Sequence, residues 1–77
     1  MRRITGTALL VQESRIRLLA DDGRGMVFIL APDAPIEPQD LPPLVGARLR
    51  LSYTRSPRLM AGIVHDLHVL DTRETRA

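Results

Sequence analysis

A proline-rich segment at residues 31–43, APDAPIEPQDLPP, limits the possible folds of this chain more than any other feature. Five of its 13 residues are proline. Proline lacks a backbone N–H and fixes its own φ, so this density excludes a long helix and the interior of a sheet. Pro38 suits the first position of a helix, so we expect at most one short helical turn, through Gln39 to Leu41. The chain is therefore divided into two parts joined by an irregular connection.

The part before the connection begins with two predicted strands. Residues 3–12 are rich in β-branched and aliphatic side chains, and Gly6 predicts a bend or a bulge in this strand. In residues 15–20, Arg15 and Arg17 alternate with aliphatic side chains. This alternation predicts a half-buried strand with an arginine face.

A third strand follows a predicted turn at residues 21–25, DDGRG. Asp22 and Gly23 form a favoured hairpin dipeptide because both residues tolerate positive φ. The next segment, MVFIL at residues 26–30, is a continuous apolar run. Such a run predicts a strand that is covered on both faces or paired centrally in its sheet.

The part after the connection predicts two more strands. Residues 47–53, ARLRLSY, alternate so that two leucines and the tyrosine share one face, while Arg48 and Arg50 lie on the other. Residues 59–70, LMAGIVHDLHVL, give the last strand, in which Gly62 predicts another bend.

Five short strands with a long connection before the fourth predict an all-β fold, a five-stranded Greek-key barrel of the OB type. Bends at Gly6 and Gly62 fit this fold, because a small barrel needs strongly bent first and last strands. An SH3-like barrel is the alternative, since it also has five short strands; the long connection favours the OB type. We expect the barrel to span residues 1–70 and a flexible polar tail to span residues 71–77.

The order of these segments resembles that of a cold-shock domain along most of the chain. Val27, Phe28 and Ile29 match in kind the first three positions of that family's V-F-V-H motif, whereas its K-G-F-G-F motif is absent. The resemblance implies a barrel that binds single-stranded nucleic acid, and it implies a base contact for Phe28. The family's other base-stacking aromatic positions carry aliphatic or arginine side chains here: Leu9, Leu10, Arg15 and Arg17.

The charged residues are unevenly distributed. All eleven Lys+Arg residues are arginine, against nine acids, and the formal net charge is +2. Residues 41–65 hold four arginines and no acid, whereas residues 33–40 hold three acids and no base. The exclusive use of arginine has two interpretations, the codon preference of a GC-rich genome or selection for planar, bidentate contacts to phosphate. The acid-free basic segment is compatible with an anionic partner.

These observations predict a binding surface for single-stranded DNA or RNA. OB-folds bind at the face of strands two and three, flanked by the loops between strands one and two and strands four and five. Arginine can itself stack on bases, which offsets the shortage of aromatic side chains. The alternative is a solvated arginine face that only keeps strand edges from pairing. The predicted site residues are Arg15, Arg17, Phe28, Arg55 and Arg58.

A protein partner is the competing interpretation. The chain is 44% hydrophobic with only two aromatic residues, so an aliphatic core could extend to the surface. The apolar run at residues 26–30 needs a cover on at least one face, which another protein or a second copy of the chain could supply. The alternative function is therefore a protein adaptor or a homodimer with no nucleic-acid role.

We expect no catalysis and no cofactor. The serines and threonines lack a histidine and an acid in any recognisable motif, and the chain has no cysteine. His65 and His68 are three residues apart, so they point to opposite faces of a regular strand and do not suit a shared metal. No apolar run approaches the roughly 20 residues of a membrane span. We expect a soluble cytoplasmic protein with no membrane partner.

Overall fold

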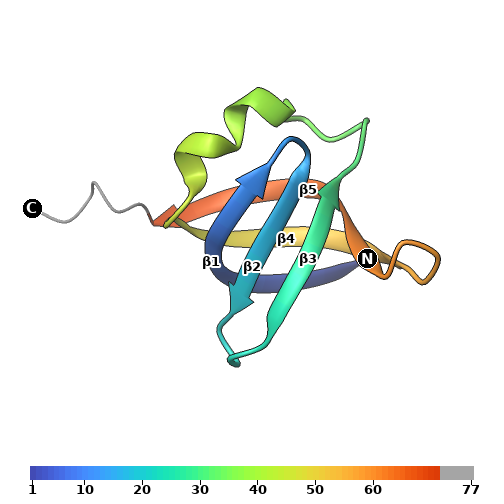
Figure 1. The fold of residues 1–77 in the computed structure, drawn as a ribbon, viewed down its shortest axis with the longest axis horizontal. Helices are drawn as coiled ribbons and strands as arrows, with labels where there is room; N and C mark the ends of the chain where they lie inside the picture. The colour runs from blue at the N-terminus through green and yellow to red at the C-terminus, as the bar shows by residue number, and fades with distance from the viewer. Residues whose placement is uncertain (72–77) are drawn as a thin grey trace, which may run out of the picture.

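Five strands form a closed barrel in the computed structural model, which describes residues 1–71 of the chain (Figure 1). The order around the barrel is β1-β2-β3-β5-β4, and β1 pairs with β4 to close it. The β3–β5 pair is parallel and the other pairs are antiparallel. The predicted all-β, five-stranded barrel is confirmed. The strands are β1 (Arg2–Gln12), β2 (Arg15–Ala20), β3 (Gly25–Leu30), β4 (Arg48–Ser56) and β5 (Ala61–Asp71).

The proline-rich connection forms two short 3₁₀ turns, η1 (Pro38–Asp40) and η2 (Pro42–Leu44). Pro38 starts the first turn, as its fixed φ predicts. The carboxylate of Asp40 accepts a hydrogen bond from the backbone N–H of Glu37 at 3.2 Å, which caps this turn. Leu41, between the two turns, is fully buried in the barrel core. The connection is therefore anchored to the barrel, and its turns lie near the end where β1 turns into β2 (Figure 1).

Alternation along each strand builds the core. On β4, Leu49, Leu51 and Tyr53 are buried while Arg48 and Arg50 are exposed, as predicted. The ring of Phe28 meets that of Tyr53 edge to face, with centroids 5.0 Å apart and planes at 75°. Such a pair contributes roughly 0.5–1.5 kcal/mol beyond its buried area. The largest fully buried side chains are Phe28, Ile16, Leu18, Leu41, Leu49, Leu51 and Val64.

The two predicted bends lie where strands approach closely. Gly6 pairs with Ala20 of β2 and with Leu49 of β4, so β1 passes from one neighbour to the other at this residue. A Cβ on Gly6 would lie 2.3 Å from the carbonyl oxygen of Leu19. A Cβ on Gly62 would lie 2.6 Å from Cδ1 of Phe28. Glycine is therefore required at both positions because of the space that the barrel leaves there.

The bulge in β1 is separate from this bend. The register of β1 against β2 shifts between Ala8 and Leu10, which leaves Leu9 as the extra residue. This shift reverses the faces of the strand: Ala8 is buried before the bulge, and Leu10 is exposed after it.

No helix among residues 1–71 is long and apolar enough to cross a bilayer. Asp71, the first residue of the predicted tail at residues 71–77, is the last residue of strand β5. Residues 72–77 lie outside the described part of the chain.

Replacing Gly6 by alanine should lower the free energy of unfolding by about 1–3 kcal/mol or more, because the new Cβ would overlap backbone that cannot move away alone. Gly25→Ala is the matched control, since nothing lies within 4 Å of a Cβ built there. That variant should stay within about 1 kcal/mol of the parent protein. Urea denaturation followed by circular dichroism measures both. Equal destabilisation by the two substitutions would contradict the close approach at Gly6.

Candidate functional site

The outer face of β1, β2 and β3 presents three rows of side chains. Successive residues of a strand point to opposite faces, and the register of the three strands aligns the outward residues across them. Each arginine of β2 thus has a neighbour on both sides, from β1 and from β3. The rows are Gln12, Arg15 and Ile29; Leu10, Arg17 and Val27; and Thr7, Leu19 and Gly25.

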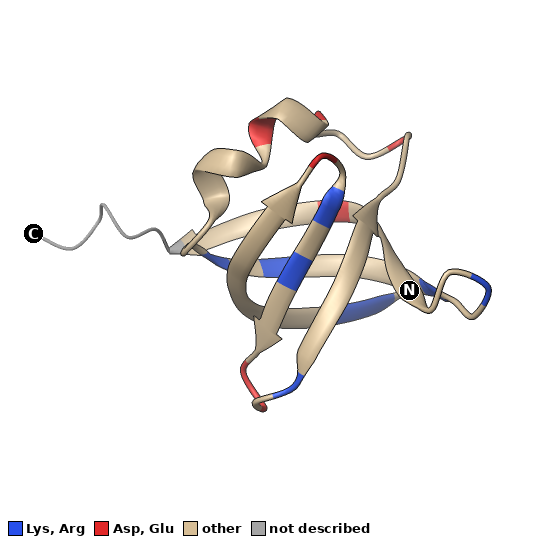
Figure 2. Cartoon of the chain, in the orientation of Figure 1, with Lys and Arg blue, Asp and Glu red and all other residues tan. Residues whose placement is uncertain are grey.

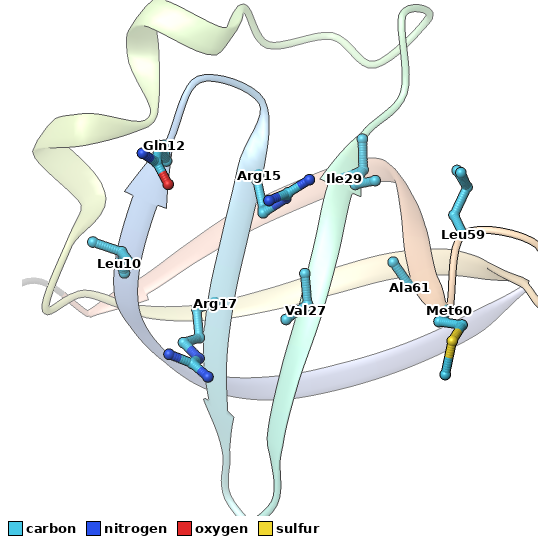
Figure 3. A pocket seen from close by; sticks show the side chains of 9 residues that line it. All are labelled: Leu10, Gln12, Arg15, Arg17, Val27, Ile29, Leu59, Met60 and Ala61. Atoms are coloured by element: carbon cyan, nitrogen blue, oxygen red, sulfur yellow. The ribbon is translucent and has the colours of Figure 1, made fainter.

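Two of these rows form the floor of a groove with a volume of about 370 Å³, the sheet-face groove (Figure 3). Its wall comes from the β4–β5 hairpin, through Leu59, Met60 and Ala61. Figure 3 shows the side chain of Arg15 extending across toward β3, on the side of Ile29. The groove combines two guanidinium groups with aliphatic surface. Its floor is formed by Leu10, Gln12, Arg15, Arg17, Val27 and Ile29.

The charges of Arg15 and Arg17 are available to a ligand. Both side chains are exposed, and among the described residues neither forms an ion pair or a hydrogen bond. Arg24 and Arg48 differ, because both pair with the acidic turn between β2 and β3. Arg24 Nε donates to Asp22 at 2.8 Å, and Arg48 donates to Asp21. Figure 2 shows the two blue segments on the first half of β2, at the end far from the turn between β2 and β3; the red segment that precedes them lies in the turn between β1 and β2.

The two aspartates of the turn between β2 and β3, Asp21 and Asp22, each pair with an arginine. The backbone N–H of Arg24 donates to Oδ1 of Asp22 at 3.1 Å. This hydrogen bond lowers the pKa of Asp22 below its ordinary value; desolvation opposes it, and the hydrogen bond and charge of the Arg24 guanidinium lower the pKa further. The carboxylate therefore stays ionised at neutral pH and holds Arg24 at the turn.

The opposite side of the barrel has a different character. Most outward residues of the first half of β1 and of β4 and β5 are polar, including Thr5, Arg50, Ser52, Thr54 and His68. Val69 and Leu70, near the end of β5, are exposed apolar residues on this part of the barrel.

A second cavity of about 610 Å³ adjoins the groove, between the first half of β3 and the β4–β5 hairpin. We name it the hairpin cleft. It shares Val27, Met60 and Ala61 with the groove, so the two cavities are neighbours. Its other lining residues are Gly25 and Met26 of β3, Tyr53, Arg55 and Ser56 of β4, and Pro57 and Gly62.

The five predicted site residues separate in the structure. Arg15 and Arg17 share the sheet-face groove, whereas Arg55 lines the hairpin cleft. Arg58 is exposed in the β4–β5 hairpin and lines neither cavity. The expected base contact of Phe28 is corrected here, because its side chain is fully buried against Tyr53.

Sequence reasoning did not assign a role in the site to the aliphatic lining residues. Val27 and Ile29 flank Phe28 in an apolar run, so the pattern alone could not tell the outer face of β3 from the inner one. Leu10 points outward because of the bulge at Leu9, which the sequence does not mark. The hairpin residues Leu59 and Met60 carried one weak signal, two apolar side chains next to a turn.

The two histidines lie in separate surroundings. A ring nitrogen of His65 lies 3.0 Å from the hydroxyl of Thr54, and the other lies 3.5 Å from a carboxylate oxygen of Asp33. His68 lies 3.3 Å from Asp66. The described part of the chain contains no group of three or more His, Cys, Asp or Glu side chains that could hold a metal ion.

No family model matches this sequence, and no curated protein matches it. Among solved structures, the chain is similar to CusF from Escherichia coli, in a structure of a CusF variant with Cu(II). The two chains are 14% identical, the match covers 87% of this chain and 88% of that one, and the TM-score is 0.64. At this identity the likeness shows the fold alone, a small OB-like barrel. The resemblance to cold-shock domains stays a prediction from the sequence.

Proposed function

We propose that this protein is a non-enzymatic module that binds single-stranded nucleic acid along the sheet-face groove. One observation carries the proposal: Arg15 and Arg17 are exposed and without an acidic partner among the described residues, on a floor of aliphatic side chains. A single strand exposes phosphates and unstacked bases together, so it suits a surface that combines cations with apolar area. The layout that resembles a cold-shock domain supports the same class of ligand.

The spacing of the two arginines suits an extended polymer. They are two residues apart on one strand, which separates their Cα atoms by about 7 Å. Each guanidinium can therefore approach a different phosphate of a strand that follows β2. Guanidinium groups also bind phosphate in a bidentate manner, which lysine cannot do.

The groove suits binding of a single strand with little preference among its bases. The described residues place no aromatic side chain on its surface, so bases would rest on Leu10, Val27 and the guanidinium planes. Phosphate contacts then supply most of the binding free energy, and such contacts depend strongly on salt. The Cu(II) of the CusF structure belongs to that protein and carries no inference about this chain.

The proposal is tested with a fluorescein-labelled single strand of about 12 nucleotides, within the roughly 4–16 that one OB-fold occupies. Anisotropy should show binding at low salt, with log affinity falling linearly as log salt rises. Each phosphate contact contributes about 0.7 to the slope, so Arg15→Ala/Arg17→Ala should reduce it by about 1.4. Arg3→Ala/Arg50→Ala removes the same charge from exposed arginines on the polar side and should change affinity much less.

Two results would refute the proposal. The first is no binding at about 50 mM salt, where even non-specific phosphate contacts are strong. The second is an equal loss of affinity in the two double variants, which would show that only the net charge matters.

The same groove variant should leave the fold intact. Exposed side chains without partners change the free energy of unfolding by about 0.5 kcal/mol or less each. We therefore expect Arg15→Ala and Arg17→Ala to unfold at nearly the urea concentration of the parent protein. Leu18→Ala, at the adjacent buried position of β2, should cost about 2–5 kcal/mol. A large loss of stability on removing the arginines would assign them a structural role instead.

A protein partner or a second copy is the other candidate, favoured by apolar exposure at the hairpin. Leu59 is 57% exposed and Met60 is 89% exposed, beside the outward face of β3. This candidate predicts a mass that rises with concentration in light scattering and indifference to nucleic acid. Leu59→Ser/Met60→Ser should then hold the protein at the monomer mass. A monomer at all concentrations would exclude the homodimer.

A further inference from the structure

We propose that the hairpin cleft is a separate subsite that takes one nucleobase of the bound strand and recognises its edge by hydrogen bonds. The inference rests on the proposed function, because the base belongs to the strand in the sheet-face groove. It extends that function from tolerant phosphate binding to a preference for particular bases at one position of the strand.

The cleft exists because the ladder between β3 and β5 is short. It joins Phe28–Leu30 to Gly62–Val64. Strand β3 begins three residues earlier, at Gly25, and β4 continues along β5 as far as Ser56. The first half of β3 therefore has β2 on one side and the cleft on the other. The wall is a strand edge whose main chain is open to a ligand.

The direction of these main-chain groups follows from the alternation along β3. The N–H of Leu30 donates to the carbonyl oxygen of Ser14 at 2.8 Å, on the β2 side, and that of Ala31 donates to Val64 at 2.8 Å, on the β5 side. Residues of odd number thus turn their N–H and C=O toward β5. At Gly25 both groups face the cleft, and at Val27 the N–H does, whereas the carbonyl group of Val27 is used by the parallel pairing of Phe28 with Gly62. They present the donor and acceptor pattern that a base edge needs.

Rigid side chains add polar groups to the same cleft. Tyr53 is 7% exposed, and its ring is fixed edge to face against Phe28. Its hydroxyl has no hydrogen-bond partner among the described residues, which also contain no buried side-chain oxygen or nitrogen without one. The hydroxyl is therefore open to solvent, and Tyr53 lines the hairpin cleft as well as a smaller cavity beside Arg2 and Arg55. A fixed hydroxyl binds at a low entropic cost.

Arg55 supplies the matching cation. It lies two residues after Tyr53 and pairs with Gly62, so it is on the inward face of β4, where the strand extends past the core. The cleft thus holds a guanidinium for phosphate beside hydroxyls for a base. Its volume of about 610 Å³ lies within the roughly 300–1,000 Å³ of small-molecule sites.

The two cavities are neighbours. They share Val27, Met60 and Ala61. Met60 is 89% exposed and has a φ of 52°, a left-handed conformation at the last residue before β5. A strand whose phosphates contact Arg15 and Arg17 can pass between Val27 and Met60 and place its next base in the cleft.

The test compares three labelled homopolymers, oligo-dA, oligo-dC and oligo-dT, against three hydroxyl variants of β4, two in the cleft and one control. The parent protein should prefer one base at least about 3-fold. Tyr53→Phe keeps the ring packing and removes one hydrogen bond, so it should weaken the preferred strand roughly 3- to 10-fold and flatten the preference. Ser52→Ala removes a hydroxyl from the polar side of the same strand and should change nothing. Ser56→Ala, a second cleft variant, should act in the same direction as Tyr53→Phe.

Amide chemical shifts separate the two proposals. With the preferred strand, shifts should appear at Arg15, Arg17 and Ile29 for the groove and at Gly25 and Gly62 for the cleft. Shifts in the groove alone, with affinities unchanged by Tyr53→Phe and Ser56→Ala, would overturn the cleft and leave the proposed function intact. Shifts in the cleft alone would overturn the groove. An absence of shifts at both would overturn both.

Discussion

The close contact of Gly62 with the Phe28–Tyr53 ring pair is the constraint on which the rest of the structure depends. At this point β5 meets β3 and β4 together, and a side chain at Gly62 would overlap both rings. The contact joins β5 to β3 and β4 and holds Phe28 inward. Because residues of a strand alternate, Val27 and Ile29 must then point outward beside Arg15 and Arg17. The same contact begins the β3–β5 ladder, which leaves the cleft open beyond it. Both cavities are consequences of this one contact.

The charged side chains separate into paired arginines at the turn between β2 and β3 and exposed arginines in the groove. The acidic turn between β2 and β3 pairs with Arg24 and Arg48, which removes two cations from competition for a ligand. The arginines of the groove lie on the first half of β2, at the end far from these acids (Figure 2). A net charge of +2 therefore understates the local positive potential along the groove.

The sequence was sufficient where a strand has one apolar face. Leu49 and Arg50 alternate clearly on β4, and Ile16 and Arg17 do so on β2, so their orientations were predicted correctly. The proline-rich segment likewise located the connection and its first helical turn. The five-stranded barrel followed from these elements, since few small folds have a long connection before the fourth strand.

The sequence was insufficient where orientation depends on tertiary contacts. Both faces of β3 are apolar, so only the ring pair with Tyr53 decides that Phe28 is inside. The separation of Arg55 from Arg58 depends on where β4 ends and the hairpin begins. That boundary cannot be predicted from the distribution of arginines and acids in this segment. Of the predicted site, the pair on β2 came together because strand alternation alone determines its position.

The bulge at Leu9 has a consequence for how such a surface can diversify. Before the bulge the even-numbered residues of β1 point inward, and after it they point outward. The one extra residue therefore places Leu10 and Gln12 in the groove and Val11 toward the interior. Moving the bulge along the strand would exchange the residues that face the ligand, while β2, β3 and their core contacts stay in place. The part of the floor that β1 contributes can therefore change by insertion or deletion of a residue. This gives a barrel of this size a way to change its binding specificity without rebuilding its core.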